Sequence, residues 1–277
     1  DLARSVDVDV LSEDAAVQLL LARSGSGDEA AARELATLLG RLPLALEEAA
    51  AYAQTTGRTL NEYASLFREH QGRLLAASPP SADYPATLRT TWEMSLQRLS
   101  GEEPAAIELL EILAHLAPER VPRFLFLPPR AGTNGFAAPA RDEAALDRQL
   151  AALLRYSLVR VENDEIFVHR LLQAIVRDRP GPGERPALAE RTLRLVERAF
   201  PQSGSAGRAR PECTRLLPHA VAALGHARDV AGARLPSAHL LRRTGVYLSA
   251  CGWSDDAVKH LGRSVAILSG SGDAYEP

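Results

Sequence analysis

The chain has 277 residues, of which 46% are hydrophobic and 24% are charged, and its formal net charge at pH 7 is −3. This balance is ordinary for a globular protein, and the length suits two or three small domains. The small negative charge excludes a general electrostatic attraction to nucleic acid or anionic membrane, and the two cysteines are too few for a disulfide framework or a metal cluster.

The chain is expected to be cytoplasmic and to belong to a longer protein. No apolar run approaches the roughly 18 residues that a membrane-spanning helix needs, and the N-terminal residues do not have the pattern of a signal peptide. Because the chain begins at Asp1 and ends after the sequence SGSGDAYEP, we interpret it as a fragment.

Residues 1–80 form the first predicted segment, a short strand followed by four helices. Alternating polar and β-branched residues in SVDVDV indicate the strand at residues 5–10. Ser12 is expected to cap the first helix, and Thr59 and Glu62 form a capping-box pattern ahead of the fourth. The four helices are predicted at residues 12–24, 28–39, 43–56 and 60–76.

The turn between the second and third helices lies in LATLLGRLPLALEEAAAY, residues 35–52. Its apolar spacing is typical of one long helix, but a proline inside a helix costs about 3 kcal/mol. Gly40 is suited to end a helix, because glycine adopts the left-handed conformation cheaply. Pro43 is suited to the first turn of the next helix, where no backbone N–H is needed. The pattern therefore predicts two helices with a break between them.

Residues 84–180 form the second predicted segment, which follows the linker ASPPSADYP. Helices are expected over TLRTTWEMSLQRL and PAAIELLEILAHLA, with Ser100 and Glu103 as a capping box before the second helix. A Gly/Pro/Ala-rich loop at 128–140 leads to a third helix over DEAALDRQLAALLRY.

The hydrophobic period then changes from that of a helix to that of a strand. SLVRVE and EIFVHR alternate at period two around the polar turn Asn163-Asp164, which predicts a β-hairpin. A helix over RLLQAIVRDR closes the segment. A hairpin that follows three helices is typical of a winged helix.

Residues 186–277 form the third predicted segment, which is again helical. The apolar and small residues of one part match the spacing of a tetratricopeptide repeat: Leu241, Gly245, Leu248, Ala257, Leu261 and Ser264. Ser254 is expected to cap the second helix of this repeat. One repeat cannot bury its own face, so further repeats are expected beside it. The predicted fold class is therefore mainly α: a helical bundle, a winged helix with one hairpin, and α-α repeats.

The chain lacks the residue patterns of common active sites. It has no G-x-x-x-x-G-K-[ST] loop, and Lys259 is its one lysine. His219 and His226 are interpreted as histidines on a helix surface rather than as metal ligands. Three carboxylate pairs are interpreted as solvated groups or as helix-start charges: Glu47–Glu48, Glu102–Glu103 and Asp255–Asp256. We therefore expect no catalytic residue, no metal site and no self-contained enzyme.

A winged helix raises the alternative of DNA binding. The helix that would read DNA begins with RDEAALDRQL, in which Asp142, Glu143 and Asp147 would repel phosphates. Four arginines reduce this repulsion: Arg141, Arg148, Arg155 and Arg160. Two alternatives therefore stay open, a winged-helix transcriptional regulator with a repeat sensor and a non-catalytic scaffold for protein partners.

Three stretches together resemble the NB-ARC group of STAND ATPases, and in particular bacterial members that end in tetratricopeptide repeats. They are LGRLPLALEEAAAY, TTWEMSLQRL and YSLVRVENDEIFVHRLLQAIVR. The resemblance implies that a P-loop domain precedes this chain and that residues 1–80 hold its last strand and a four-helix ARC domain. It also implies a winged helix at 84–180 and a tetratricopeptide array that starts at 186–277.

The resemblance implies two contacts with nucleotide. Pro43 matches the proline that packs against adenine, although a proline that only starts a helix explains the residue equally well. His169 matches the histidine of the M-H-D motif, which contacts the β-phosphate of ADP and holds the closed state. Arg170 replaces the acidic residue of that motif and is itself able to contact phosphate.

The expected function is therefore regulatory. ADP or ATP would bind to the full-length protein, whereas the chain alone is expected to bind nucleotide weakly and to show little ATPase activity. A ligand or protein partner is expected on the repeats, together with self-association of the full-length protein. Nucleic acid is a less favoured partner, and no membrane partner is expected.

Overall fold

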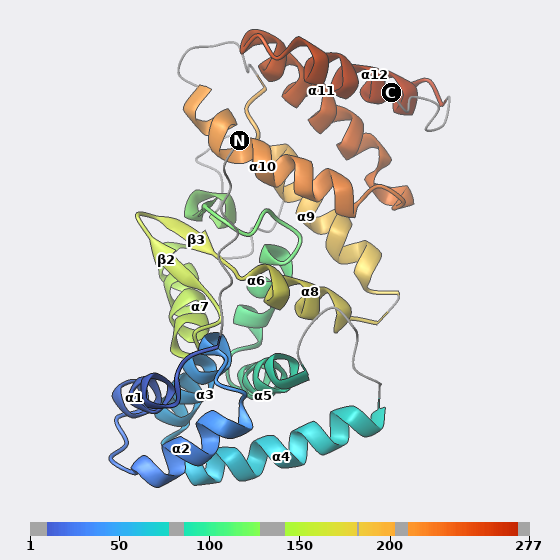
Figure 1. The fold of residues 1–277 in the computed structure, drawn as a ribbon. Coiled ribbons are helices and arrows are strands. Elements are labelled where there is room, and N and C mark those ends of the chain that lie inside the picture. The colour runs from blue at the N-terminus through green and yellow to red at the C-terminus, as the bar shows by residue number, and fades with distance from the viewer. Residues whose placement is uncertain (1–9, 78–85, 128–141, 182, 203–209, 271–277) are drawn as a thin grey trace, which may run out of the picture. The chain divides into compact units, whose positions relative to one another are not determined.

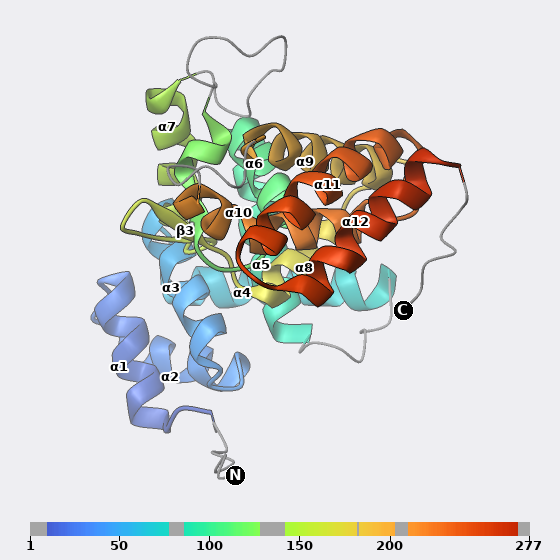
Figure 2. The same cartoon turned by 90° about the horizontal axis from the view of Figure 1, so that it is seen from above.

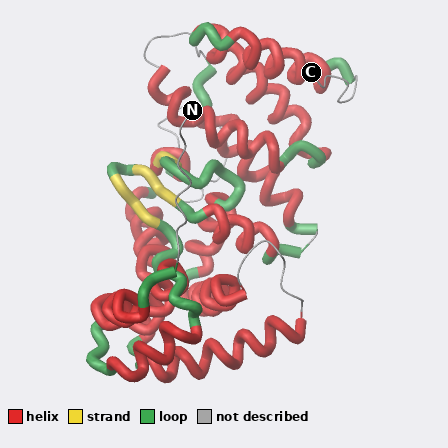
Figure 3. The backbone as a smooth tube through the Cα atoms, in the orientation of Figure 1, coloured by secondary structure: helices red, strands yellow, loops and turns green. Residues whose placement is uncertain are grey.

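The computed structural model describes residues 10–77, 86–127, 142–181, 183–202 and 210–270. These residues are mainly helical and include one small antiparallel sheet of three strands (Figures 1 and 3), which confirms the predicted α class. None of their helices is long and apolar enough to cross a membrane. Nearly all of the predicted strand and of the linker ASPPSADYP, and the whole loop at 128–140, lie outside the described residues.

The helices of the described residues are α1 (Glu13–Ser24), α2 (Glu29–Leu38), α3 (Pro43–Thr56), α4 (Leu60–Ala77), α5 (Ala86–Glu102), α6 (Pro104–Leu113), α7 (Glu143–Arg155), α8 (Arg170–Asp178), α9 (Arg185–Ala199), α10 (Arg210–His226), α11 (Arg234–Ala250) and α12 (Ser254–Leu268). The strands are β1 (Val121–Pro122), β2 (Arg160–Glu162) and β3 (Glu165–Phe167), and two short 3-10 helices are η1 (Arg123–Phe126) and η2 (Ala231–Ala233).

The chain divides into two compact units. Unit 1 consists of Asp1–Pro104 and Ala151–Leu158, and unit 2 consists of Ala105–Leu150 and Val159–Pro277. The helix α5, which the sequence places in the second segment, packs against α3 and α4 within unit 1. The helix α7 belongs to both units, because its last residues are part of unit 1.

Local side-chain chemistry sets the helix ends of unit 1. The hydroxyl of Ser12 accepts a hydrogen bond from the backbone N–H of Ala15 at 3.3 Å, which caps α1 as predicted. The Glu62 carboxylate accepts from the N–H of Thr59 at 2.8 Å, and the Thr59 hydroxyl accepts from the N–H of Glu62 at 3.2 Å. This reciprocal pair confirms the predicted capping box before α4.

The break inside LLGRLPLAL occurs where the sequence predicts it. Gly40 follows the end of α2 with φ of 65°, and Pro43 is the first residue of α3. The left-handed conformation extends to Arg41, whose φ is 54° and whose N–H donates to the carbonyl of Ala36 at 2.9 Å. The turn is therefore fixed by its own backbone hydrogen bonds as well as by glycine and proline.

The predicted capping box of Ser100 and Glu103 is wrong. Ser100 lies in the last turn of α5, and its hydroxyl donates to the carbonyl oxygen of Leu96 at 2.7 Å. A serine hydroxyl near a helix end is able to hydrogen-bond to a carbonyl oxygen of the preceding turn or to cap the following helix. The same sequence therefore fits both outcomes. The next helix, α6, begins with Pro104, which needs no N–H in the first turn.

The sheet of unit 2 has the strand order β1-β3-β2, with Ile166 of β3 opposite Val121 on one side and opposite Val161 on the other. The hairpin that joins β2 and β3 turns at Asn163 and Asp164, whose φ angles are 48° and 67°. Two successive left-handed residues suit the twist of a two-residue hairpin. The predicted hairpin is confirmed.

The helix α8 closes the sheet region and supports the end of α6. The side-chain N–H of Gln173 donates to the carbonyl oxygens of Leu113 and Leu116, at 2.8 and 3.1 Å, and Arg177 donates to the carbonyl oxygen of Ala114. The carbonyl oxygen of Leu113 also accepts from the N–H of Leu116 at 3.2 Å, so the side chains of α8 add donors where the carbonyls of a helix end lack intrahelical partners. Side chains of α8 therefore provide the polar partners that terminate α6.

The helices α9 to α12 form the remainder of unit 2, and α11 and α12 lie side by side (Figures 1 and 2). A Cβ atom placed on Gly245 would lie 2.7 Å from Cγ of Leu261, so the two helices cross too closely for a side chain there. The predicted cap at Ser254 is wrong by one residue, because Trp253 occupies the cap position and Ser254 is the first helical residue.

We expect the substitution Gly245→Ala to destabilise the chain by about 1 kcal/mol, because the overpacking exceeds the gain in helix propensity. The matched control is Gly225→Ala in α10, where a Cβ meets no atom within 4 Å. This control is expected to be neutral or to stabilise the chain by at most about 1 kcal/mol. Urea denaturation of both variants measures the difference, and equal effects would contradict the close crossing of α11 and α12.

Candidate functional site

The resemblance assigns nucleotide contacts to Pro43, His169 and Arg170. These residues lie at the starts of two helices, α3 and α8. Pro43 is the first residue of α3 and is exposed to solvent. The preceding turn is joined to the segment before α1 by a hydrogen bond from the N–H of Leu11 to the carbonyl of Arg41, at 3.1 Å. An exposed proline ring on a fixed turn offers a rigid apolar face that has no N–H donor.

His169 and Arg170 lie at the start of α8. The ring nitrogen Nδ1 of His169 accepts a hydrogen bond from the N–H of Leu171 at 3.2 Å, so His169 is the cap of the helix. An accepting Nδ1 leaves the ring proton on Nε2. The residue before it, Val168, is buried, and its N–H donates to the carbonyl oxygen of Pro118 at 2.8 Å. The chain is thus anchored immediately before the exposed pair.

The electrostatics at the start of α8 favour an anion. A helix start carries a partial positive charge and free N–H groups, and Arg170 is an exposed cation in the first turn. Desolvation of the ring, and secondarily the charge of Arg170, lower the pKa of His169. The lowered pKa favours the neutral imidazole, in which Nδ1 accepts from Leu171 and Nε2 carries the proton.

The structure brings His169 and Arg170 together in unit 2, whereas Pro43 lies in unit 1. A nucleotide contact that involves all three residues remains a prediction. The residues do fit their assigned groups locally, because an apolar ring suits a base, and an N–H donor beside a guanidinium suits a phosphate.

Glu48, one turn after Pro43, is a residue that the sequence reading missed. Its side chain was expected to be solvated, but only 1% of its surface is exposed. Burial raises the pKa of the Glu48 carboxyl well above its ordinary value, and the nearby Trp92 indole opposes this shift. Neither oxygen of the carboxyl has a hydrogen-bond partner of normal geometry among the described residues. The spacing Ala45, Glu48, Tyr52 on the buried face of α3 is the signal that could have found it.

Other polar groups are buried in the same core. Tyr63 of α4 and Thr91 and Ser95 of α5 are each fully buried. Burial raises the pKa of Tyr63, and the neighbouring Thr91 opposes this shift. Three helices of unit 1 therefore share a polar interior around Glu48 rather than a purely apolar one.

The histidine prediction is wrong for His219. Its side chain is buried, and its Nε2 lies 3.2 Å from the carbonyl oxygen of Arg120. Burial lowers the pKa of His219. His226, about two turns further along α10, has its ring 5.4 Å from the ring of His115. Within the described residues, no three His, Cys, Asp or Glu side chains are arranged to hold a metal ion.

The acidic start of α7 is used for capping and ion pairing. Asp142 accepts a hydrogen bond from the N–H of Ala145 at 2.7 Å, and Asp147 pairs with Arg123. Arg160 pairs with Glu162 at 2.7 Å. The basic groups here are thus partly neutralised by neighbouring carboxylates, which does not favour binding to a phosphate backbone.

Comparison with known families gives one match. A family model described as a domain of unknown function, DUF7779, matches residues 94–185. The chain is similar to that domain from the second half of α5 through the sheet and α8, so the match includes His169 and Arg170 but not Pro43. No curated protein matches the chain.

Proposed function

We propose that the chain is the regulatory part of a STAND-type signal-transduction ATPase. The observation that carries this proposal is the start of α8, where His169 caps the helix through Nδ1 and lies next to Arg170, both of them exposed to solvent. In this proposal His169 and Arg170 hold the phosphates of ADP, and Pro43 lies against adenine.

The domain assignments have their own support. The order α6-β1-α7-β2-β3, with β3 between the other two strands, favours a winged helix in unit 2. The four helices around the Pro43 turn suit an ARC-type bundle. The close crossing of α11 and α12 at Gly245 suits a tetratricopeptide-like repeat that senses a ligand or protein partner.

In this proposal the residues of the chain act by binding the diphosphate. Neutral His169 donates through Nε2–H and Arg170 contributes charge, so both favour the state in which a diphosphate is bound. Loss of these contacts would release the winged helix and allow self-association of the full-length protein. Hydrolysis is assigned to the separate domain that would carry the phosphate-binding loop, because the chain has no such loop of its own.

Two substitutions at His169 separate ligand contact from helix capping. Asparagine is a good N-cap, so His169→Asn keeps an acceptor for the N–H of Leu171 but removes Nε2–H, whereas His169→Ala removes both. We expect both variants to weaken ADP binding to the full-length protein about tenfold, and the alanine variant alone to lose about 1 kcal/mol of stability. Calorimetric titration with ADP and urea denaturation measure the two effects.

The control for these variants is His239→Asn, which changes an exposed histidine of α11. Unchanged ADP affinity in both His169 variants would overturn the proposed phosphate contact. A loss of affinity in the alanine variant alone would assign the effect to the helix cap and would also contradict direct contact.

A further inference from the structure

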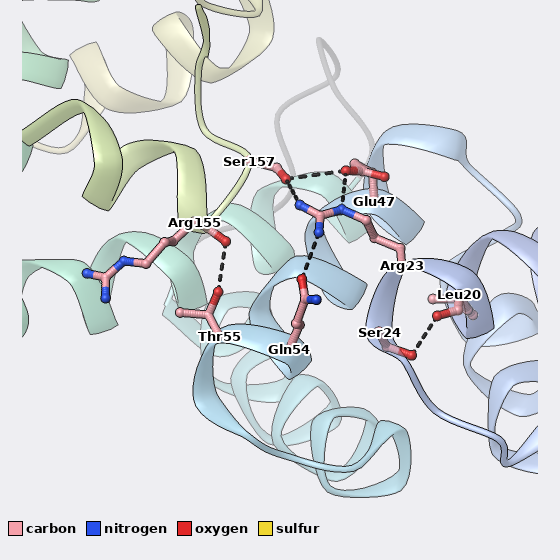
Figure 4. Close-up of polar contacts among 8 residues, drawn as sticks. All are labelled: Leu20, Arg23, Ser24, Glu47, Gln54, Thr55, Arg155 and Ser157. Atoms are coloured by element: carbon pink, nitrogen blue, oxygen red, sulfur yellow. Dashed lines mark hydrogen bonds and ion pairs between the residues drawn. The ribbon is translucent and has the colours of Figure 1, made fainter. Parts of the chain in front are cut away.

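Arg23, in the last turn of α1, contacts side chains from two other parts of unit 1 (Figure 4). Its Nε lies 2.8 Å from Oε1 of Glu47, and its Nη1 donates to Oε1 of Gln54 at 2.7 Å. Its Nη2 donates to the hydroxyl of Ser157 at 3.3 Å. Glu47 and Gln54 belong to α3, whereas Ser157 follows the end of α7, so one guanidinium joins three segments.

Further hydrogen bonds fix the same end of α7. The Ser157 hydroxyl donates to Oε1 of Glu47 at 3.4 Å, and the Thr55 hydroxyl donates to the carbonyl oxygen of Arg155 at 2.8 Å. Between these two, Tyr156 is fully buried, and its hydroxyl donates to the Glu102 carboxylate at 3.0 Å. The buried ring of Tyr156 and the hydrogen bonds around it therefore hold the end of α7. The side chains of Arg23, Glu47, Gln54 and Ser157 are called the polar layer below.

The backbone at this point is in a conformation that its sequence disfavours. Ser157 has φ of 54°, a left-handed conformation that costs a non-glycine residue free energy. Its N–H donates to the carbonyl of Leu154 at 3.0 Å, and the N–H of Leu158 donates to the carbonyl of Leu153 at 3.1 Å, which terminates α7. The contacts of the Ser157 hydroxyl with Arg23 and Glu47 offset this cost.

The polar layer is accessible to water and salt. The side chains of Arg23 and Glu47 retain 35% and 39% of their exposure. Ion pairs this exposed are weak and are screened by salt, whereas the packing of the fully buried Tyr156 ring is not. The polar layer is thus the part of the attachment that opens most readily.

We propose that Arg23, Glu47, Gln54 and Ser157 form a releasable latch, the Arg23 latch, that holds the end of α7 on the bundle of unit 1. Because α7 continues into unit 2, the latch controls whether the end of this shared helix stays attached to α1 and α3. Opening frees residues 151–158 locally, while α1 to α5 remain folded. This device does not depend on nucleotide binding.

Hydrogen exchange of the full chain, followed by mass spectrometry, tests the latch. We expect Arg23→Ala to speed exchange in the peptide that covers residues 151–158 by about tenfold, since the charge-assisted contacts of the guanidinium are lost. Exchange in α2 and α4 is expected to stay at the wild-type rate. The matched control is Arg33→Ala, which removes an exposed arginine that pairs with Glu13 and Glu29 elsewhere in unit 1 and is expected to leave residues 151–158 unchanged.

A milder variant and a salt series keep the test decisive if Arg23→Ala unfolds. Ser157→Ala removes the hydroxyl alone and is expected to speed exchange at residues 151–158 about threefold. Raising sodium chloride from about 0.05 M to about 1 M is expected to speed exchange there in the wild type. Exchange that stays at the wild-type rate in these variants, or that rises equally throughout unit 1, would overturn the proposal.

Discussion

Replacement of Glu48 by glutamine is expected to make the protein progressively more stable than the wild type as the pH rises above the pKa of the unfolded carboxyl. Burial raises the pKa of the Glu48 carboxyl in the folded protein, so in the interval between the unfolded and folded pKa values this group is protonated when folded but ionised when unfolded. Between the two pKa values the unfolded chain is favoured by up to about 1.4 kcal/mol for each pH unit. Glutamine has a similar shape and no proton to lose.

Urea denaturation of wild type and Glu48→Gln at several pH values measures this effect as a difference. Below the pKa of the unfolded carboxyl both states of Glu48 are protonated, so the two proteins are expected to have similar stability there.

The control is Glu62→Gln. The hydrogen bonds from the backbone and hydroxyl of Thr59 lower the pKa of Glu62, so its stabilisation is fully present above the pKa of the unfolded carboxyl. That variant should lose stability by an amount that is constant between pH 5 and 8. A pH-independent difference for Glu48→Gln would contradict a protonated Glu48.

Removal of the Arg243 side chain should destabilise the chain by about 3 kcal/mol or more, the usual result of breaking a largely buried ion pair. Arg243 of α11 lies 2.8 Å from the Glu197 carboxylate of α9, and both side chains are nearly nine-tenths buried. Its guanidinium also donates to the carbonyl oxygen of Phe200 at 3.2 Å. The substitution Arg243→Ala therefore leaves both a carboxylate and a helix-end carbonyl without their donor.

Urea denaturation provides the measurement, with Arg68→Ala as the control. Arg68 pairs with Glu34 on the surface, and exposed pairs contribute about 1 kcal/mol or less. The double variant Arg243→Met with Glu197→Met is expected to be more stable than Arg243→Ala, because it leaves no isolated charge. A cost for Arg243→Ala no larger than that for Arg68→Ala would show that the pair between α9 and α11 is solvated in solution.

The features that the sequence predicts well are those in which the partners are a few residues apart. The break at Gly40 and Pro43, the box of Thr59 and Glu62, and the hairpin turn at Asn163 all depend on short-range backbone chemistry. Ser100 shows the limit of such reasoning, because a hydroxyl near a helix end has two local acceptors of similar quality.

The features that the sequence reading missed depend on partners distant in the chain. Glu48 is buried beside Trp92 of another helix, and His219 lies within hydrogen-bonding distance of the carbonyl of Arg120. A composition or a local pattern does not reveal which helix covers a given face. For the candidate site, the motif leads to His169 itself, but its role as the cap of α8 requires the conformation of the chain after β3.

The attachment of α8 to α6 has a mechanical consequence. The helix α8 has nine residues and so spans about 14 Å, with no flexible segment between its cap and its contact with α6. Gln173, about one turn from His169, is fixed to the carbonyls of Leu113 and Leu116. A displacement of the cap therefore passes through Gln173 to the end of α6 and to the chain that leads into β1.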